Sequence, residues 1–244
     1  MPPRDLALDL LDLVLPVTCA GCGVPGRALC PACLLRWAGE PRRCEDAAGR
    51  LDRMDGTTLP VWALAENTGP VRRAVVAWKD GGRADVTAWL AALLGRAAAW
   101  LAARGAIPPG VLVVGAPPSA AGARLRGEDL VAALATAHAR AVPGAVPARA
   151  LRLSGRGRDQ VGLGVRGRAA NLAGRVRVRE RCRAELAGAR VVLVDDVLTT
   201  GATLAACRAA LESADAQVVG AVVLAVTRPP GTPTAWLVAS PHPG

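Results

Sequence analysis

The stretch from Arg190 to Thr227 constrains the fold more than any other part of the chain, because it combines two apolar runs with a helical pattern between them. The run "RVVLVDDV" has the length and the β-branched content of a buried strand. The pattern "ATLAACRAALESADA" indicates a helix, and "QVVGAVVLAVT" indicates another strand. Strands that are joined through a helix pair in parallel. The stretch therefore predicts a parallel α/β sheet.

Segments upstream extend the same alternation. A further strand is predicted at "GVLVVGAPP", and helices are predicted at "PVRRAVVAWKDGG", "ADVTAWLAALLGRAAAWLAARGA" and "EDLVAALATAHARAV". A charged, breaker-rich linker, "EPRRCEDAAGRLDRMDGTTLP", ends near Pro60. We therefore expect an N-terminal region at 1–60, an α/β domain at 61–228 and an irregular tail at 229–244.

The N-terminal region contains two C-x2-C pairs, a spacing that lets each pair hold one side of a tetrahedral ion. The four cysteines are Cys19, Cys22, Cys30 and Cys33. Four thiolates leave no open coordination position, so we expect a structural zinc ion that supplies folding energy to a small module. The alternatives are four unrelated buried or redox thiols, or Cys44 in place of one ligand. Core packing is expected for Cys182 and Cys207.

Nothing in the sequence predicts export or a membrane span. The apolar N-terminus carries Asp5, Asp9 and Asp12 at helical spacing, which indicates an amphipathic helix and not a signal peptide. The longest uncharged window, 105–123, contains four prolines and cannot be a membrane helix. We expect a cytoplasmic protein.

The positive charge of the chain is carried almost entirely by arginine. The chain has a net charge of +10, and its 30 basic residues include a single lysine, Lys79, which leaves 29 arginines. Because such an excess indicates mutational drift toward Arg, we discount it as a sign of nucleic-acid binding, although polyanions stay plausible partners. Because Lys79 was not replaced by Arg despite this drift, its position is a candidate for a site that needs a compact ammonium group. The alternative is that the lysine survived by chance at a helix end.

Two adjacent acids and a Thr/Gly-rich turn follow the apolar part of the strand in "VVLVDDVLTTGATL". Ligands of parallel sheets bind beyond the carboxyl ends of the strands, where Asp195 and Asp196 are expected to emerge. The backbone N–H groups of the turn, at the start of a helix, would cradle a phosphate; the turn residues are Thr199, Thr200, Gly201, Ala202 and Thr203. The carboxylates would accept hydrogen bonds from sugar hydroxyls or hold hydrated Mg²⁺. The pattern therefore predicts a ribose-phosphate site.

Two other functions could explain an acid pair at this place. An ATPase strand would need a G-x-x-x-x-G-K-[ST] loop, and the only lysine lies in "AWKDGG", which does not match. The acids could also simply cap the helix, which explains either one alone better than both acids with the complete turn.

The sequence resembles the ComF family, which is associated with competence and DNA uptake. "VVLVDDVLTTGATL" resembles the phosphoribosyl pyrophosphate (PRPP) motif of type I phosphoribosyltransferases, and "CAGCG", "CPAC", "GPVRRAVVAWKDGGR", "RLRGEDL" and "DQVGLGVRGRAANLAG" follow the family order. The resemblance implies a type I phosphoribosyltransferase-like domain behind a four-cysteine zinc module. It also implies PRPP as ligand and Mg²⁺ as cofactor, with single-stranded DNA or the competence machinery as further partners.

The resemblance also assigns roles to residues. Asp195, Asp196 and Arg168 would be catalytic, with Arg168 on a basic loop near the pyrophosphate. Further substrate-binding residues would be Lys79, Arg126, Gln160 and Asn171. Lys79 occupies the place of a K-Y-x-G block, with Asp80 instead of Tyr, and the Gly81–Gly82 turn could let it swing toward a phosphate.

The chain departs from the family at two places. The family's R-G-F-N-Q is "RGEDL" here, at 126–130, which loses an aromatic residue and two amides and gains two acids. Thr199 stands where purine phosphoribosyltransferases carry an Asp, so purine salvage of that type is disfavoured. His138 and His242 are expected to be bystanders. The hypotheses are phosphoribosyl transfer to an unknown acceptor, a non-catalytic binding protein in DNA uptake or nucleotide sensing, and a structural zinc adaptor, which leaves the turn unexplained.

Overall fold

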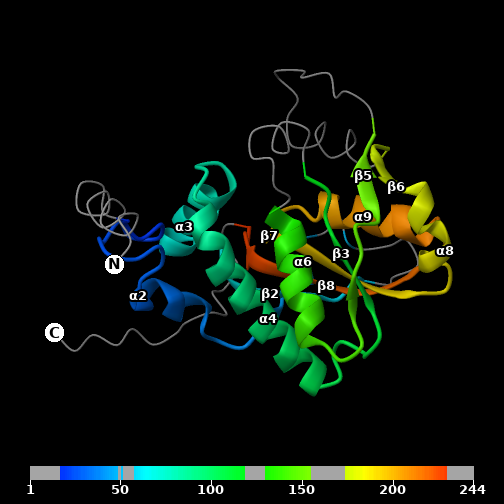
Figure 1. Cartoon of the computed structure of the whole chain (residues 1–244), viewed down its shortest axis with the longest axis horizontal. Coiled ribbons are helices and arrows are strands. Elements are labelled where there is room, and N and C mark those ends of the chain that lie inside the picture. The colour runs from blue at the N-terminus through cyan, green and yellow to red at the C-terminus, as the bar shows by residue number, and fades with distance from the viewer. Residues whose placement is uncertain (1–16, 49–50, 52–57, 119–129, 155–173, 230–244) are drawn as a thin grey trace, which may run out of the picture.

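A computed structural model describes residues 17–48, 51, 58–118, 130–154 and 174–229 of the chain (Figure 1). Its centre is a six-stranded sheet in the order β1-β2-β8-β7-β3-β4. The five strands from β2 to β4 in that order are parallel, and β1 pairs antiparallel with β2. The strands are β1 (Arg42–Arg43), β2 (Val61–Glu66), β8 (Gln217–Val226), β7 (Arg190–Leu198), β3 (Leu112–Gly115) and β4 (Val146–Pro147).

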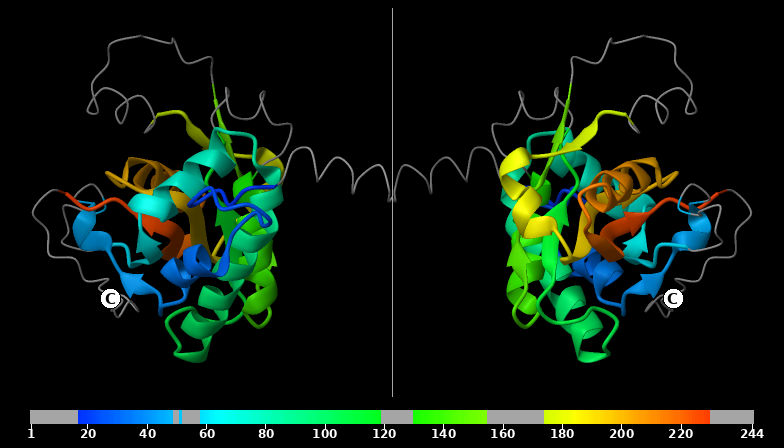
Figure 2. Two further views of the ribbon diagram at one scale, coloured as in Figure 1. Left: turned by 90° about the vertical axis from the view of Figure 1, so that its left-hand side faces the viewer. Right: turned by 90° about the vertical axis from the view of Figure 1, so that its right-hand side faces the viewer.

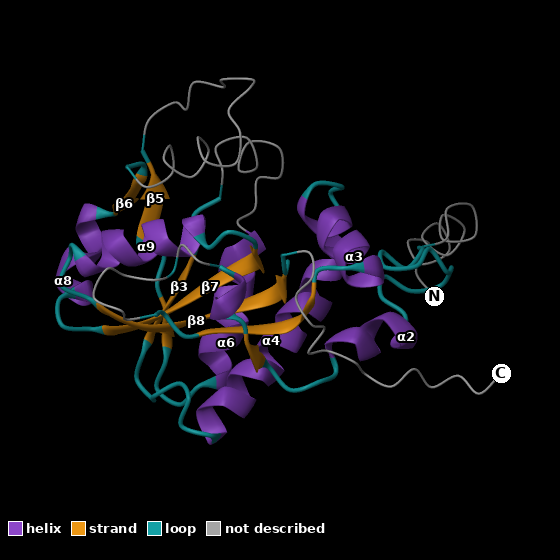
Figure 3. Ribbon diagram, turned by 180° about the vertical axis from the view of Figure 1, so that it is seen from behind, coloured by secondary structure: helices purple, strands orange, loops and turns teal. Residues whose placement is uncertain are grey.

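Helices cover both faces of the sheet, as the side views in Figure 2 show. One face packs on α3 (Gly69–Lys79), α4 (Thr87–Ala103) and α6 (Leu130–Ala141). The other packs on α8 (Arg183–Leu186), α9 (Ala202–Glu212) and a separate antiparallel pair, β5 (Leu151–Leu153) and β6 (Val176–Val178). Figure 3 shows this pair apart from the central strands.

The apolar runs explain the two cores. Successive side chains of a strand point to opposite faces of a sheet. Accordingly Val192 and Val194 of β7 pack in the core under α4 and α6, whereas Val191 and Leu193 pack in the core under α9. In a strand that is buried on both faces, every side chain packs in a core. The apolar run of β7 therefore contains no polar residue before Asp195.

The parallel register brings three chain segments to one sheet edge. Leu198 of β7 pairs with Val226 of β8, and Val226 pairs with Glu66 of β2. The carboxyl ends of these strands are therefore neighbours. Helix α3 follows β2 at this edge, and α9 follows β7.

The cysteine segment is docked on the large domain and shares its core. Its ordered elements are α2 (Pro31–Leu34) and a 3₁₀ turn, η1 (Leu35–Trp37), and Trp37 is fully buried in the core that also contains α3 and α4. Arg73 Nε donates to the carbonyl oxygen of Gly21 at 2.6 Å, and Arg83 donates to that of Thr18 at 2.8 Å. Charge-assisted hydrogen bonds of this kind are among the stronger ones in proteins.

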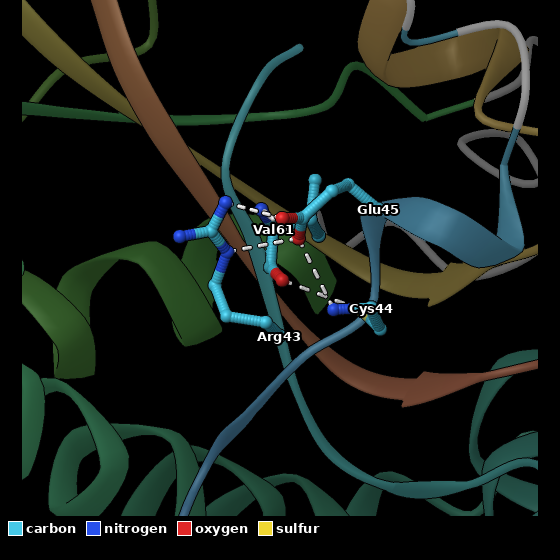
Figure 4. Close-up of polar contacts among 4 residues, drawn as sticks. All are labelled: Arg43, Cys44, Glu45 and Val61. Atoms are coloured by element: carbon cyan, nitrogen blue, oxygen red, sulfur yellow. Dashed lines mark hydrogen bonds and ion pairs between the residues drawn. The ribbon is translucent and has the colours of Figure 1, made fainter.

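The connector between the cysteine segment and β2 packs against the α/β domain. Its Glu45, in the 3₁₀ turn η2 (Glu45–Ala47), accepts hydrogen bonds from the Arg43 guanidinium and from the backbone N–H groups of Cys44 and Val61 (Figure 4). The boundary expected near Pro60 thus falls between two hydrogen-bonded strands, β1 and β2.

One helical stretch of the described residues, Ala84–Ala103, is long and apolar enough to cross a bilayer. It comprises the 3₁₀ turn η3 (Ala84–Val86) and α4. Its residues Leu90, Leu94 and Leu101 are fully buried in the protein core, and α4 packs against α6. We therefore assign it to the core of the α/β domain.

The α/β fold with a mostly parallel sheet is confirmed, as are the helices α3, α4, α6 and α9 and the strands β3, β7 and β8. The sequence analysis missed β1, β2, β4, β5 and β6. Most of these are two or three residues long, with one 3₁₀ turn, η4 (Glu180–Cys182), following β6. Runs that short carry no periodicity to recognise.

Candidate functional site

Asp195 and Asp196 lie inside β7 and are buried, with 8% and 4% of their surface exposed. The expectation that they emerge at an exposed strand end is therefore wrong, because β7 continues to Leu198. Each carboxylate also accepts a main-chain hydrogen bond: Asp196 N–H donates to Asp195 Oδ1 at 2.8 Å, and Val197 N–H donates to Asp196 Oδ1 at 2.7 Å. These contacts fix both side chains.

The buried position of the acid pair disfavours the ionised form of Asp195. Burial, and then the neighbouring charge of Asp196, raise the pKa of Asp195 to about 8, against the opposing effect of Lys79. Such a carboxyl group tends to hold a proton at neutral pH. A ligand that brings a cation or hydroxyl donors would stabilise the ionised form. Perturbed carboxyl groups of this kind are typical of functional sites.

Lys79 is the one cation that pairs with this acid cluster among the described residues. It is the last residue of α3, and its Nζ forms an ion pair with Asp196 Oδ2. Burial lowers the pKa of Lys79, the two carboxylates raise it, and the net shift is upward. About half of the Lys79 side chain is exposed, so its ammonium reaches the acids from the solvent side.

The turn after Lys79 requires glycine. Gly82 has a φ of +70°, and a Cβ at Gly81 would lie 2.8 Å from the carbonyl oxygen of Ala77. No other residue fits both positions without strain. The chain therefore reverses directly after Lys79, at the edge where the acid pair lies.

The predicted phosphate turn joins β7 to α9 beside the acids. Gly201 caps α9 with a φ of +78° and is buried, while Thr199 is exposed and Thr200 and Thr203 are partly exposed. Within the described parts of the chain, the backbone N–H groups of 199–203 have no main-chain acceptor. Open N–H groups at the start of an eleven-residue helix are suited to bind an anion.

The connector packs against this turn, a contact that the sequence analysis missed. A Cβ on Gly201 would lie 2.9 Å from Leu51 Cγ and 3.1 Å from the Cβ of Ala48. Leu51 and Ala48 are themselves buried. The turn therefore has its shape fixed from the N-terminal side of the chain as well as by its own strand and helix.

Polar residues also line the neighbouring strand ends, and the sequence analysis missed them. Asn67 Nδ2 donates to Thr227 Oγ1 at 3.0 Å, and Arg228 lies 2.9 Å from Asp46 and 3.7 Å from Glu66. Asn67 Oδ1 is buried and has no hydrogen-bond partner within the described part of the chain. The sequence signal was the position of these residues directly after the apolar runs of β2 and β8.

Four of the predicted site residues lie outside the described residues. These are Arg126, Gln160, Arg168 and Asn171. The structure thus brings together Asp195, Asp196, Lys79 and the turn.

The four cysteines form a second candidate site, at the module. The Sγ atoms of Cys19, Cys22, Cys30 and Cys33 all lie within 4.8 Å of one another. A tetrahedral zinc ion with Zn–S bonds of about 2.3 Å would place its sulfurs about 3.8 Å apart, and Cys22 and Cys30 are separated by 3.6 Å. Burial raises the pKa of the Cys19 thiol, but backbone hydrogen bonds from Cys30, Cys22 and Gly21 outweigh it and lower the value to about 6, whereas burial and the neighbouring thiols raise the pKa of Cys33. The cluster could therefore hold zinc.

The other cysteines and His138 have no comparable partners. Cys44 is buried in the opposite core, where its thiol faces the carbonyl oxygen of Val61, so it does not replace a ligand of the cluster. Cys182 and Cys207 are buried there too, as expected for core packing. His138 is fully buried in α6, and both ring nitrogens lack a hydrogen-bond partner in the described structure. Burial lowers its pKa to about 4.

The C-terminal part of the α/β domain is similar to a known family. Residues 120–235 match the family model described as "Phosphoribosyl transferase domain". The matched residues, which include β7, the acid pair and the turn, are therefore similar to a phosphoribosyl transferase domain.

The comparisons with solved structures and with curated proteins give weaker evidence. A solved structure described as "structure of the allosteric regulatory enzyme of purine biosynthesis" is similar at 23% identity with a TM-score of 0.38. The match covers 57% of this chain and 26% of the length of that one. No curated protein matches the chain.

Proposed function

We propose that this chain is a phosphoribosyltransferase of the ComF type that binds PRPP or another 5-phosphoribose ligand and transfers the phosphoribosyl group to a nitrogen acceptor. The observation that carries the proposal is the buried Asp195–Asp196 pair directly beside a turn with open N–H groups, inside the segment that matches the transferase domain. The acids are placed to accept hydrogen bonds from ribose hydroxyls. The turn is placed to bind the 5-phosphate.

Transfer breaks the bond between C1 of the ribose and the pyrophosphate oxygen, and pyrophosphate leaves with the bonding electrons. The acceptor nitrogen then forms the C1–N bond and releases a proton. The chain's own part is to hold the ribose and its phosphate in a fixed geometry and to offer positive charge to the leaving group. Arg168 and Lys79 are the proposed sources of that charge. Asp195 and Asp196 would hold hydrated Mg²⁺, which neutralises charge on the pyrophosphate.

The second candidate is a non-catalytic protein that uses the same site to bind ribose phosphate, or that binds nucleic acid, in DNA uptake. The sequence at 126–130 favours it, because "RGEDL" places two acids in a loop that the resemblance assigns to the substrate. Pyrophosphate release in the presence of candidate nucleobases and amines separates the two functions. Binding of PRPP without release for any acceptor supports the non-catalytic protein.

Calorimetric titration with PRPP and Mg²⁺ tests the site itself. We expect binding to wild type and none to Asp195→Asn combined with Asp196→Asn, in which the amide oxygens still accept the main-chain hydrogen bonds. A matched control removes two exposed acids far from the turn, Glu185→Gln with Asp215→Asn. Normal binding by the first double variant, or equal loss in the control, contradicts the assignment.

A further inference from the structure

The chain's positive charge is concentrated in one segment. Residues 149–190 contain 12 arginines against three acids, which accounts for +9 of the total net charge of +10. The other residues of the chain carry 18 basic and 17 acidic groups, a balance of +1. A mutational drift toward Arg would act on the whole chain, so drift does not explain why the excess lies in one place.

The described part of this segment includes an arginine-lined ribbon, β5 paired with β6. Arg152 and Arg177 are directly opposite each other across the two strands, and both are exposed. Beneath them Leu151 and Val176 are buried, and β6 packs on α9. Like charges that face each other across a strand pair are destabilising. Their presence on so short a ribbon indicates an anionic partner.

Two more arginines extend the charged face along β6. Arg175 and Arg179 each lie two positions from Arg177, and side chains at that spacing point to the same face of a strand. Arg175 Nε donates to the Ser154 carbonyl oxygen at 3.4 Å, and Arg179 Nε donates to that of Leu151 at 3.3 Å. These bonds hold both guanidinium groups over the ribbon. Neither strand contains an acidic residue.

The composition of the segment narrows the kind of partner. Residues 149–190 contain no aromatic residue, so the ribbon offers none of the stacking platforms with which proteins hold single-stranded nucleic acids. The major groove of B-form DNA admits a two-stranded ribbon, whereas that of A-form RNA is too narrow. Guanidinium groups without base-stacking partners suit phosphate contacts that carry no sequence information.

We propose that the solvent face of the β5–β6 ribbon binds the phosphate backbone of double-stranded DNA without sequence preference. This surface goes beyond the proposed ribose-phosphate site and does not depend on it. It lies at the end of the molecule opposite α2 (Figure 1).

Fluorescence anisotropy with a labelled mixed-sequence duplex of about 20 base pairs, the length of two helical turns, tests the proposal on the full chain. The test variant is Arg152→Gln with Arg177→Gln, and the matched control is Arg72→Gln with Arg140→Gln, two arginines that are exposed on helices. Titrations at several salt concentrations give the salt slope. Each phosphate contact contributes about 0.9 to that slope.

We expect the ribbon variant to lose about 1.8 in salt slope and at least about tenfold in duplex affinity at 0.1 M salt. Its thermal stability should be unchanged or higher, because a repulsive pair is removed. The control should keep the wild-type slope. An unchanged slope in the ribbon variant, an equal loss in the control, or tighter binding of the matched single strand than of the duplex would each overturn the proposal. So would a parallel loss of PRPP affinity, which would assign the ribbon to the ribose-phosphate site.

Discussion

Replacing Lys79 with methionine removes the cation that faces the buried acids and keeps a similar side-chain length. The two partners of this ion pair are unequally exposed: the Lys79 side chain is 48% exposed and that of Asp196 is 5% exposed. Loss of Lys79 therefore leaves Asp196 beside Asp195 in a buried position, with no opposite charge paired to them among the described residues. Loss of Asp196 instead leaves an ammonium that water can solvate.

The magnitude follows from these exposures. Removing one partner of a fully buried pair costs about 3–5 kcal/mol, whereas exposed pairs contribute about 0–1 kcal/mol. Because water already screens Lys79, we expect Lys79→Met to lower the free energy of unfolding by about 1–3 kcal/mol, between these limits. Asp196→Asn should cost less, and it should restore stability when it is combined with Lys79→Met.

The effect should depend on pH with a definite sign. Lys79 lowers the pKa of Asp195, so without Lys79 this pKa rises further above its unfolded value. A carboxyl group whose pKa is raised in the folded state loses stability as pH increases from the unfolded pKa toward the folded one. The window for Asp195 runs from about 4 to about 8. Lys79→Met should therefore be more destabilising at pH 8.5 than at pH 5.5.

Urea unfolding of wild type, Lys79→Met, Lys79→Arg and the combined Lys79→Met, Asp196→Asn variant at the two pH values measures these differences. Lys79→Arg is the control that retains the charge, and its unfolding free energy should stay close to wild type. If Lys79→Met and wild type unfold with the same free energy at pH 8.5, the acids do not depend on this lysine and the electrostatic account of the site is wrong.

Three further predictions concern other parts of the fold. His138 is held neutral in the folded state, with a pKa of about 4 against 6.5 unfolded, so its protonation should cost about 2 kcal/mol between pH 8 and pH 5; the change in the free energy of unfolding between these pH values, measured with urea, should differ by this amount between wild type and His138→Leu. Gly201→Ala should lower the free energy of unfolding by about 1–3 kcal/mol, because φ is positive and the new Cβ meets Leu51; a calorimetric melting temperature equal to wild type would contradict this. Cys19→Ser with Cys22→Ser should abolish binding of about one zinc per chain, measured by elemental analysis, and full zinc content in this variant would contradict the four-cysteine site.

The sequence predicted the parts of the fold that long apolar runs encode. Val191–Val194 could only be a strand buried on both faces, and the glycine-bearing turn after it could only start a helix, so β7, α9 and β8 followed. The sequence did not reveal β5 and β6, because three-residue strands are stabilised by packing on α9 and not by their own pattern.

The sequence predicted which residues form the candidate site, but it did not predict that the two acids are buried. The acid pair, the turn and Lys79 were recognisable from residue types and spacing alone. That β7 continues through Asp195 and Asp196 depends on β8, which pairs with it as far as Leu198. A long-range pairing of this kind has no local signal. The same reason hid the contact of Leu51 with Gly201, since 150 residues separate them in the sequence.

Two segments that adjoin the four-cysteine module, helix α3 and the connector, reach the candidate site. Helix α3 begins against the module, where Arg73 binds the carbonyl oxygen of Gly21, and ends at Lys79 beside the acids. The connector that follows the module includes Leu51, which packs against Gly201 of the predicted phosphate turn. A rigid helix and a buried contact both transmit displacement, because packed interiors do not deform continuously. We therefore expect the position of Lys79 and the shape of the turn to change when the module unfolds on loss of its cysteines.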